Sequence, residues 1–208
     1  MELAEIYENV IEGNAPQVQA GVQAALAQGT AADVILNQAL IAAMNEVGKR
    51  FEEGEFYVPE MLIAARAMQA GLNLLKPQLT ASGVKSAGTV AIGTVKGDLH
   101  DIGKNLVAMM LEGAGFEVED LGVDVTPEAF VKAAQNGVQV IGMSALLTTT
   151  MNNMKATIQA LQDSGVRGQV KVVIGGAPVT EAFAQQIGAD AYSPDASGAV
   201  RTVRTLLA

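Results

Sequence analysis

The chain contains no cysteine and no tryptophan, and its single histidine stands at position 100. Without cysteine there is no disulfide framework, no thiolate metal site and no thiol nucleophile. This composition is typical of an intracellular protein. Aromatic residues make up only 4% of the chain, which argues against a platform on which nucleic-acid bases stack. Any histidine chemistry in this protein therefore depends on His100.

Positive charge is also scarce, because 13 Lys and Arg face 22 Asp and Glu and give a formal net charge of −9. Nucleic-acid-binding proteins normally carry a basic patch or stripe, so we expect no nucleic acid among the partners. The N-terminal segment lacks the cationic and apolar regions of a secretory signal. No apolar run reaches the roughly 18 residues of a membrane span. We therefore expect a cytoplasmic protein with no membrane partner.

Hydrophobic residues make up 50% of the 208 positions, which is enough for one large or two small packed domains. Residues 1–80 show only helical periodicity, in four apolar stripes separated by short connections. Pro59 stands where the fourth helix would begin. These features predict an N-terminal four-helix bundle whose methionines fill the core. The methionines at helical core spacing include Met44, Met61 and Met68.

The pattern changes after residues 81–87, which are small and polar and predict a linker. Residues 88–208 alternate between apolar runs typical of strands and amphipathic helical stretches. Five β–α units of this length imply a parallel sheet with helices on both faces. The predicted fold class is α/β: a helical-bundle cap domain followed by a Rossmann-like (flavodoxin-like) five-stranded parallel sheet domain. The predicted strands are 90–95, 116–121, 138–143, 170–174 and 189–192, and the predicted helices are 102–113, 127–136, 151–164, 180–187 and 195–207.

Local signals mark the ends of several predicted helices. Thr30 with Asp33 forms an S/T-x-x-D/E start signal in the N-terminal region. Thr126, Thr180 and Ser193 precede helices of the second region, as N-cap residues do. Glycines follow the predicted helix ends at positions 115, 137, 165 and 188.

The first strand of the second region runs into a loop that carries the strongest chemical signal. This loop, residues 96–103, holds two glycines, two carboxylates and the only imidazole. Ligands of parallel α/β sheets bind beyond the carboxyl ends of the strands, where the strand order reverses. Asp98 can accept a hydrogen bond from one ring nitrogen of His100 and leave the other free as a metal ligand or a base. A solvated loop histidine with a polar helix start explains the same residues equally well.

Two further loops should reach the same edge of the sheet. Residues 144–150 provide four hydroxyl groups, and residues 175–178 begin with paired glycines that would let a bulky ligand lie against the backbone. Ordinary capping and turn chemistry is the alternative for both loops. A zinc site is disfavoured because the chain has one histidine and no cysteine. The sequence contains no dinucleotide fingerprint, P-loop or nucleophile elbow.

Three short elements follow one another on these loops: D-x-H-x-x-G (Asp98, His100, Gly103), S-x-L (Ser144, Leu146) and G-G (Gly175, Gly176). In this order they resemble the cobalamin-binding fingerprint. A helical region followed by such a domain looks like the methyl-carrying module of methionine synthase. With no other domains attached, the chain is most similar to the small corrinoid proteins of anaerobic methyltransferase systems.

The resemblance implies that cobalamin or a related corrinoid binds with its own base displaced and with His100 as the lower ligand of cobalt. Asp98 would hold the other nitrogen of the imidazole. Thr150 stands where methionine synthase has the serine that completes a proton relay. The helical domain would cap the upper face, with Tyr57, Met61 and Met68 as candidate contacts. The other implied cofactor contacts are Gly97, Asp101, Ile102, Gly103 and Leu146 around the corrin, and Ser144, Thr148, Gly175, Gly176 and Ala196 along the displaced nucleotide tail.

The resemblance further implies a carrier that alternates between methylcobalamin and Co(I) states. A substrate-specific methyltransferase would load the methyl group, and a second methyltransferase would move it to coenzyme M or tetrahydrofolate. A reductive activase would rescue oxidised cobalt. The chain would then be a methyl-carrier subunit and no enzyme by itself. The residues leave open the methyl donor, the acceptor, the native lower base and the oligomeric state.

Other functions share parts of this pattern. A cobalamin-dependent sensor or transcription regulator has the same binding module but needs a DNA-reading element with a basic face, which the acidic first 80 residues do not offer. The small subunit of an adenosylcobalamin mutase would carry an adenosyl instead of a methyl upper ligand. A flavodoxin-like domain without a corrin is the third alternative.

Overall fold

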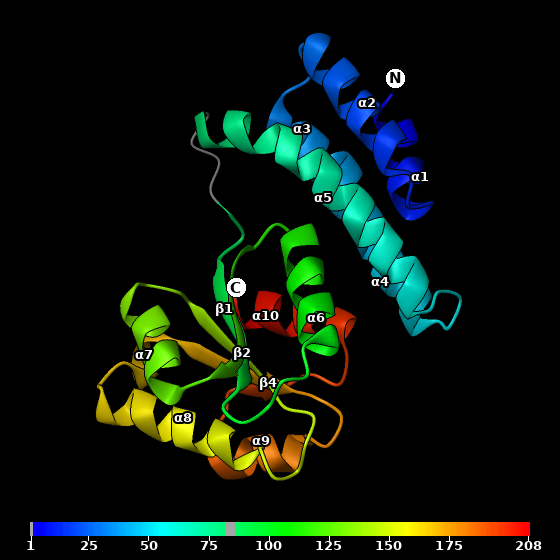
Figure 1. Cartoon of the computed structure of the whole chain (residues 1–208). Helices are drawn as coiled ribbons and strands as arrows, with labels where there is room; N and C mark the ends of the chain where they lie inside the picture. The colour runs from blue at the N-terminus through cyan, green and yellow to red at the C-terminus, as the bar shows by residue number, and fades with distance from the viewer. Residues whose placement is uncertain (1, 82–85) are drawn as a thin grey trace. The chain divides into compact units, whose positions relative to one another are not determined.

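The computed structural model describes residues 2–81 and 86–208, and the chain divides into two compact units (Figure 1). The first unit comprises Met1–Ser86 with Glu112–Gly115, and the second comprises Ala87–Leu111 with Phe116–Ala208. Most of the predicted linker, residues 82–85, lies outside the described residues. None of the helices that the structure describes is long and apolar enough to cross a membrane.

The described residues of the N-terminal region form four helices, as its periodicity predicts. The third of them is continuous, but its middle is wound as a π-helix, which the sequence pattern did not indicate. The signal at Thr30 and Asp33 predicts the start of this helix to within two residues, but Thr30 is wrong as its N-cap, because the N-cap is Ala31 and makes no side-chain cap hydrogen bond. The helices are α1 (Leu3–Ile11), α2 (Ala15–Ala27), the α3–η1–α4 helix (Ala32–Ile35, Leu36–Ile41, Ala42–Glu52) and α5 (Val58–Ala81).

Methionines help to fill the core of this helical unit. Met44, Met61 and Met68 are each at most 2% exposed, so their prediction as core residues is confirmed. The prediction that Met61 and Met68 contact the upper face of a cofactor stays a prediction. Tyr57, at the start of α5, is 66% exposed and remains available for contact.

The second unit is a five-stranded parallel sheet with the strand order β2-β1-β3-β4-β5. All five predicted strands and all five predicted helices are present, with ends within a few residues of the predicted ones. The strands are β1 (Thr89–Val95), β2 (Glu117–Val125), β3 (Val140–Ser144), β4 (Lys171–Gly175) and β5 (Ala191–Tyr192). The helices are α6 (Ile102–Gly113), α7 (Pro127–Gln135), α8 (Asn152–Asp163), the short η2 (Arg167–Gln169), α9 (Glu181–Ile187) and α10 (Ala196–Leu207).

Helices cover both faces of this sheet. Figure 1 shows α7, α8 and α9 along one side and α6 and α10 along the other. Alternate residues of β1, such as Ala91 and Val95, enter a buried cluster with Phe130 of α7 and Ile158 of α8. This alternation is the period of two expected for a strand that packs helices on both faces. The predicted N-cap Thr180 is confirmed, whereas α10 is capped by Asp195 and not by Ser193.

Candidate functional site

Three loops meet at the carboxyl edge of the sheet, as predicted. Thr94 at the end of β1 pairs with Ser144 at the end of β3, and Ser144 pairs with Gly175 at the end of β4. The chain leaves β1 toward β2 on one side and returns to β3 on the other, so the strand order reverses between β1 and β3. The loops after β1 and β3 therefore stand at the switch point where α/β sheets bind ligands.

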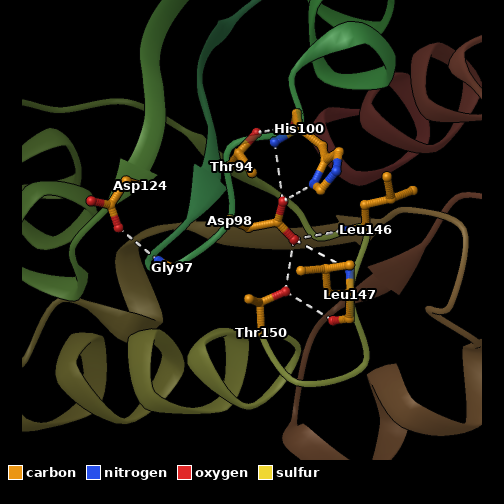
Figure 2. A network of polar contacts seen from close by, with 8 residues as sticks. All are labelled: Thr94, Gly97, Asp98, His100, Asp124, Leu146, Leu147 and Thr150. Atoms are coloured by element: carbon orange, nitrogen blue, oxygen red, sulfur yellow. Dashed lines mark hydrogen bonds and ion pairs between the residues drawn. The ribbon is translucent and has the colours of Figure 1, made fainter.

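Asp98 is the centre of the polar contacts at this edge (Figure 2). Its side chain is completely buried, and both of its oxygens are engaged. Oδ1 accepts from the ring nitrogen Nδ1 of His100 at 2.7 Å and from the His100 backbone N–H at 3.1 Å. Oδ2 accepts from the Thr150 hydroxyl at 2.7 Å and from the backbone N–H groups of Leu146 at 2.8 Å and Leu147 at 3.3 Å.

These hydrogen bonds determine whether the Asp98 carboxyl group is ionised. Burial by itself raises the pKa of Asp98, but the hydrogen bonds from Thr150, from His100 and from the Leu146 amide outweigh it. The pKa of Asp98 is therefore held well below its ordinary value. Asp98 is ionised at neutral pH and provides a buried negative charge directly behind the imidazole.

The His100 side chain lies between this charge and the solvent, with 51% of its surface exposed. Because Asp98 accepts from Nδ1, the neutral ring carries its proton there and presents a lone pair on Nε2. Within residues 2–81 and 86–208, no group forms a hydrogen bond with Nε2. The Thr94 hydroxyl donates to the His100 carbonyl oxygen at 2.9 Å and fixes the backbone of the loop. This arrangement is typical of a histidine that is oriented by a carboxylate to bind a metal.

The Thr150 hydroxyl has one hydrogen and two acceptors within reach. It lies 2.7 Å from Oδ2 of Asp98 and 2.8 Å from the Leu147 carbonyl oxygen. When Asp98 is ionised, the hydroxyl can donate to it; if Oδ2 took up a proton, Asp98 could donate to Thr150 and the hydroxyl could turn to Leu147. The sequence predicted this hydroxyl as part of a relay, and its geometry suits that task.

Large apolar side chains on the two loops are exposed to solvent. Leu99 and Ile102 are 71% and 78% exposed, and Leu146 and Leu147 are also exposed. They follow β1 and β3, as His100 and Thr150 do. Leu99 and Leu147 were missed by the sequence analysis, although a bulky residue directly beside the only histidine was a usable signal. Exposed apolar groups around one outward-facing nitrogen suit a large ligand that carries a metal at its centre.

The remaining predicted residues of the first loop differ in their contacts. Gly97 has a φ of +81° and donates its N–H to the Asp124 carboxylate at 2.6 Å. Asp101 accepts from the Asn105 side chain at 3.1 Å. Gly103 lies in the first turn of α6, and a Cβ added there would meet no atom within 4 Å. Gly103 therefore leaves open space beside Ile102, whereas Gly97 is needed for a backbone turn.

Hydroxyl groups at the end of β3 and on the loop that follows it are available for a ligand. Ser144 and Thr148 make no side-chain hydrogen bond with the described part of the chain, and Thr148 is exposed. Ala196 differs from them, because it is 5% exposed in the first turn of α10 and packs inside the unit.

The paired glycines have another explanation than the one the sequence suggested. Gly176 has a φ of +124°, and a Cβ there would lie 1.9 Å from the Ala145 carbonyl oxygen. A Cβ on Gly175 would lie 3.0 Å from the Ser193 carbonyl oxygen. The neighbouring loop at Ala145 therefore requires glycine at position 176, and the Ser193 carbonyl leaves little room for a side chain at position 175.

A metal bound here would have His100 as its ligand from this loop. The residues that the structure describes contain no group of three or more His, Cys, Asp or Glu side chains placed to hold a metal ion. A zinc site of the usual composition is therefore absent from this part of the chain. A cofactor that brings its own equatorial ligands fits His100 and the apolar groups around it.

Comparisons with known proteins identify the family of the chain. Residues 88–203 match a family model described as a B12 binding domain, and residues 2–76 match a second model with the same description. The chain is 43% identical over 206 residues to dimethylamine corrinoid protein 3 of Methanosarcina acetivorans, covering 99% of this chain and 96% of that protein. It is 46% identical over 186 residues to trimethylamine corrinoid protein 1 of Methanosarcina mazei, covering 88% and 86%.

A solved structure shows the same fold over nearly all of the chain. The methanol:cobalamin methyltransferase complex MtaBC from Methanosarcina barkeri matches with a TM-score of 0.88 and 31% identity, covering 99% of this chain and 79% of the matched one. The family models, the relatives and this structure all have a corrin cofactor in their names or descriptions. The chain belongs to the corrinoid proteins that are built from B12 binding domains.

Proposed function

We propose that this protein carries a methyl group on a corrinoid bound without its lower base, with Nε2 of His100 as the lower cobalt ligand. The observation that carries the proposal is the Asp98–His100 pair, which fixes one ring nitrogen at 2.7 Å and leaves the other toward solvent. A bound corrinoid supplies a cobalt centre that takes up and releases a methyl group. The protein contributes the ligand, its orientation and its protonation state.

Asp98 and Thr150 control the imidazole in this proposal. The Asp98 carboxylate keeps the proton on Nδ1, so the lone pair of Nε2 is ready to bind a metal. If Nε2 of His100 were not bound to the metal, its lone pair could take up a proton, and the Asp98–His100–Thr150 group could hold that proton. The two acceptors of the Thr150 hydroxyl let it follow such a change by rotation alone.

The rest of the site would hold the cofactor by shape. Leu99, Ile102, Leu146 and Leu147 would contact the apolar face of the corrin around His100. The edge of the corrin would lie beside the backbone of Gly97 and the carboxylate of Asp101, in the open space at Gly103. The residues we assign to the displaced nucleotide tail are Ser144, Thr148, Gly175 and Gly176, with Ala196 as a buried wall.

The two parts of the chain would have different tasks. We assign residues 1–80 to a cap over the reactive face of the cofactor, residues 81–87 to the linker and residues 88–208 to corrinoid binding. The family match over residues 2–76 and the exposed Tyr57 support this assignment. An apolar cap would exclude water from a reduced metal centre.

The partners follow from the carrier role. In this proposal the protein only carries the methyl group, and a separate methyltransferase would deliver it. The relatives named as dimethylamine and trimethylamine corrinoid proteins support a methylated amine as the donor. The similar fold of MtaBC, which is a methanol:cobalamin methyltransferase complex, supports a methyltransferase partner. A second methyltransferase, acting on coenzyme M or tetrahydrofolate, and a reductive activase would complete the system.

The ligand assignment is tested by electron paramagnetic resonance. The protein is loaded with hydroxocobalamin, reduced to Co(II), and compared with and without nitrogen-15 histidine. A change in the nitrogen splitting identifies His100, since the chain has no other histidine. His100→Ala should still bind the corrinoid and lose the label-dependent splitting. A nitrogen signal that ignores the label would come from the benzimidazole and would refute the proposal.

The donor is tested separately with purified methyltransferases. The loaded and reduced protein is mixed with a methyltransferase for dimethylamine, trimethylamine or methanol, and the cofactor spectrum is followed. We expect methylation with a methylamine enzyme and its substrate. Methylation with the methanol enzyme alone would contradict the amine assignment but would leave the carrier role intact.

A further inference from the structure

The backbone at Asp124 is strained where β2 ends. Its φ is +52°, and it is the one non-glycine residue with a positive φ in the part of the chain that the structure describes. L-residues rarely adopt this conformation, although Asp and Asn do so more readily than others. Strain of this kind persists where the surroundings fix it, and it is frequent at functional sites.

A bulge in β2 creates this conformation. Gly93 pairs with Gly122, but Val95 pairs with Val125, so β2 advances three residues while β1 advances two. The extra residue lies between Gly122 and Val125, directly before Asp124 or at it. Bulges re-aim side chains, and they occur often beside active sites. Here the bulge turns the Asp124 side chain toward the loop that follows β1.

Two hydrogen bonds join Asp124 to that loop. The Asp124 carboxylate accepts from the Gly97 N–H at 2.6 Å, and the Asp124 N–H donates to the Asp98 carbonyl oxygen at 3.0 Å. Figure 2 shows the first of them on the side of Gly97 opposite the Leu146 and Leu147 contacts. The backbone before and after the Gly97–Asp98 peptide is therefore held from β2, while the Asp98 carboxylate is held from the loop after β3.

Asp124 contributes little to the core, because it is exposed to solvent. Its strained backbone is therefore not compensated by burial of its side chain. We propose that Asp124 is a positioning residue, which fixes the Gly97–Asp98 backbone so that Asp98 keeps His100 aligned toward the cobalt. This inference rests on the proposed function, since it concerns the same imidazole.

Three substitutions separate the backbone strain from the hydrogen bond. Asp124→Asn keeps an acceptor oxygen and tolerates the positive φ. Asp124→Gly tolerates the positive φ but removes the acceptor. Asp124→Ala loses the acceptor and retains the strain. Glu119→Gln is the matched control, because Glu119 is an exposed acid of the same strand whose carboxylate makes no hydrogen bond within the described residues.

The first measurement uses the protein without corrinoid. Hydrogen exchange at the Gly97 amide reports directly on its bond to Asp124. We expect exchange about tenfold faster in Asp124→Gly and in Asp124→Ala, since a hydrogen bond to a carboxylate is lost. Asp124→Asn and Glu119→Gln should exchange at close to the wild-type rate. Circular dichroism and the unfolding midpoint show whether each variant is folded.

The second measurement repeats the nitrogen-15 experiment on loaded Co(II) protein. In Asp124→Gly the ratio of histidine-ligated to unligated cobalt should fall by up to about tenfold, matching the loss at Gly97. Asp124→Asn should restore the wild-type ratio, which a loss of general stability would not explain. A wild-type signal that Asp124→Gly leaves unchanged would overturn this inference alone. A wild-type protein without any histidine nitrogen would overturn the proposed function and this inference with it.

Discussion

The helical unit and the α/β unit bury different kinds of side chain. In the helical unit the buried side chains of the described residues are apolar, such as Ile6, Leu40 and Met61. The buried polar and charged side chains of the described residues all belong to the α/β unit. They are Thr94, Asp98, Lys104, Thr150, Thr157, Ser193 and Ser197.

Burial of a polar group is costly unless its hydrogen bonds are satisfied. No buried side-chain nitrogen or oxygen in the described residues lacks a partner. The α/β unit therefore keeps its buried polar groups satisfied, Asp98 and Thr150 at the edge of its sheet among them, whereas the described buried side chains of the helical unit are all apolar. This contrast indicates which part of the fold can hold a reactive polar group. The rigid edge of the sheet can hold an ionised carboxylate away from water, whereas the core of the small helical unit gains no stability from such a group.

The largest expected effect comes from Asp98→Ala. It removes the acceptor for Thr150, for His100 and for the backbone amides that meet Oδ1 and Oδ2. Breaking a buried charged network from one side costs about 3–5 kcal/mol. We expect the unfolding free energy of the α/β unit, measured by urea denaturation with circular dichroism, to fall by about this amount.

The matched variant for that experiment is Asp98→Asn, which keeps the shape and one acceptor oxygen. It should recover part of the lost stability. Hydrogen exchange divides the effect between the units: protection should fall for residues 86–208 and persist for the helical residues 2–81. An equal loss in both units would contradict the contrast between them.

A packing defect in the helical unit should have the next largest effect on the unfolding free energy. Met61 is completely buried, so Met61→Ala leaves a cavity and should cost about 2–5 kcal/mol. Met61→Leu, which nearly conserves volume, should cost less than about 1.5 kcal/mol. Exchange at the Leu146 and Leu147 amides, which donate to Asp98, should remain at the wild-type rate. Faster exchange at these amides would show that the polar edge depends on the helical core.

Thr150→Val tests one member of the polar network. It removes the hydroxyl that donates to Asp98 at 2.7 Å but conserves the side-chain volume. A hydrogen bond to a charged group contributes about 1.5–3 kcal/mol, and denaturation should show a loss in this range. Thr150→Ser keeps the hydroxyl and should lose only about 0.8 kcal/mol, the value of one buried methyl-sized group. If both variants lose the same amount, packing and not the hydrogen bond explains the role of Thr150.

Acid should weaken the α/β unit through Asp98. Its folded pKa is held well below the unfolded value of about 3.9, because the hydrogen bonds favour the charged form. Stability from this group is complete above the unfolded pKa, and it is lost as the pH falls toward the folded pKa. Between these two pKa values, the unfolding free energy should therefore rise with pH by up to about 1.4 kcal/mol per pH unit because of Asp98. Asp98→Asn should lack this part of the slope, and an unchanged slope would remove Asp98 from the acid response.

The sequence predicted the elements of both units well, because apolar periodicity determines which faces are buried. The period of 3.6 gave the four helices, and the alternation of apolar runs gave all five strands. The π-helical turn at Leu36–Ile41 was not predicted, since it does not disturb the apolar stripe. The predicted linker could not be compared at residues 82–85, which lie outside the described part of the chain.

The candidate site was predicted less completely. The contact between Asp98 and His100 followed from their spacing and from the loop after β1. The role of Asp124 did not, because it depends on a bulge in β2 that no local pattern marks. The paired glycines were noticed, but their reason lies in the backbone of Ala145 and Ser193, far away in sequence. Contacts between distant loops therefore set the limit of what the sequence could show.

The smallest expected effect is a difference in unfolding free energy between substitutions at two helix starts, one in each unit. The Thr180 hydroxyl accepts from the Phe183 N–H at 3.2 Å, whereas Thr30 precedes a helix whose N-cap, Ala31, makes no side-chain cap. Thr180→Ala should therefore cost about 1 kcal/mol, and Thr30→Ala should change the unfolding free energy by less than about 0.5 kcal/mol. Denaturation of the two variants side by side measures the difference. An equal loss would mean that Thr30 caps its helix after all, as its sequence signal suggested. The expected inequality would show that an N-cap residue stabilises a helix only where its oxygen meets a backbone N–H.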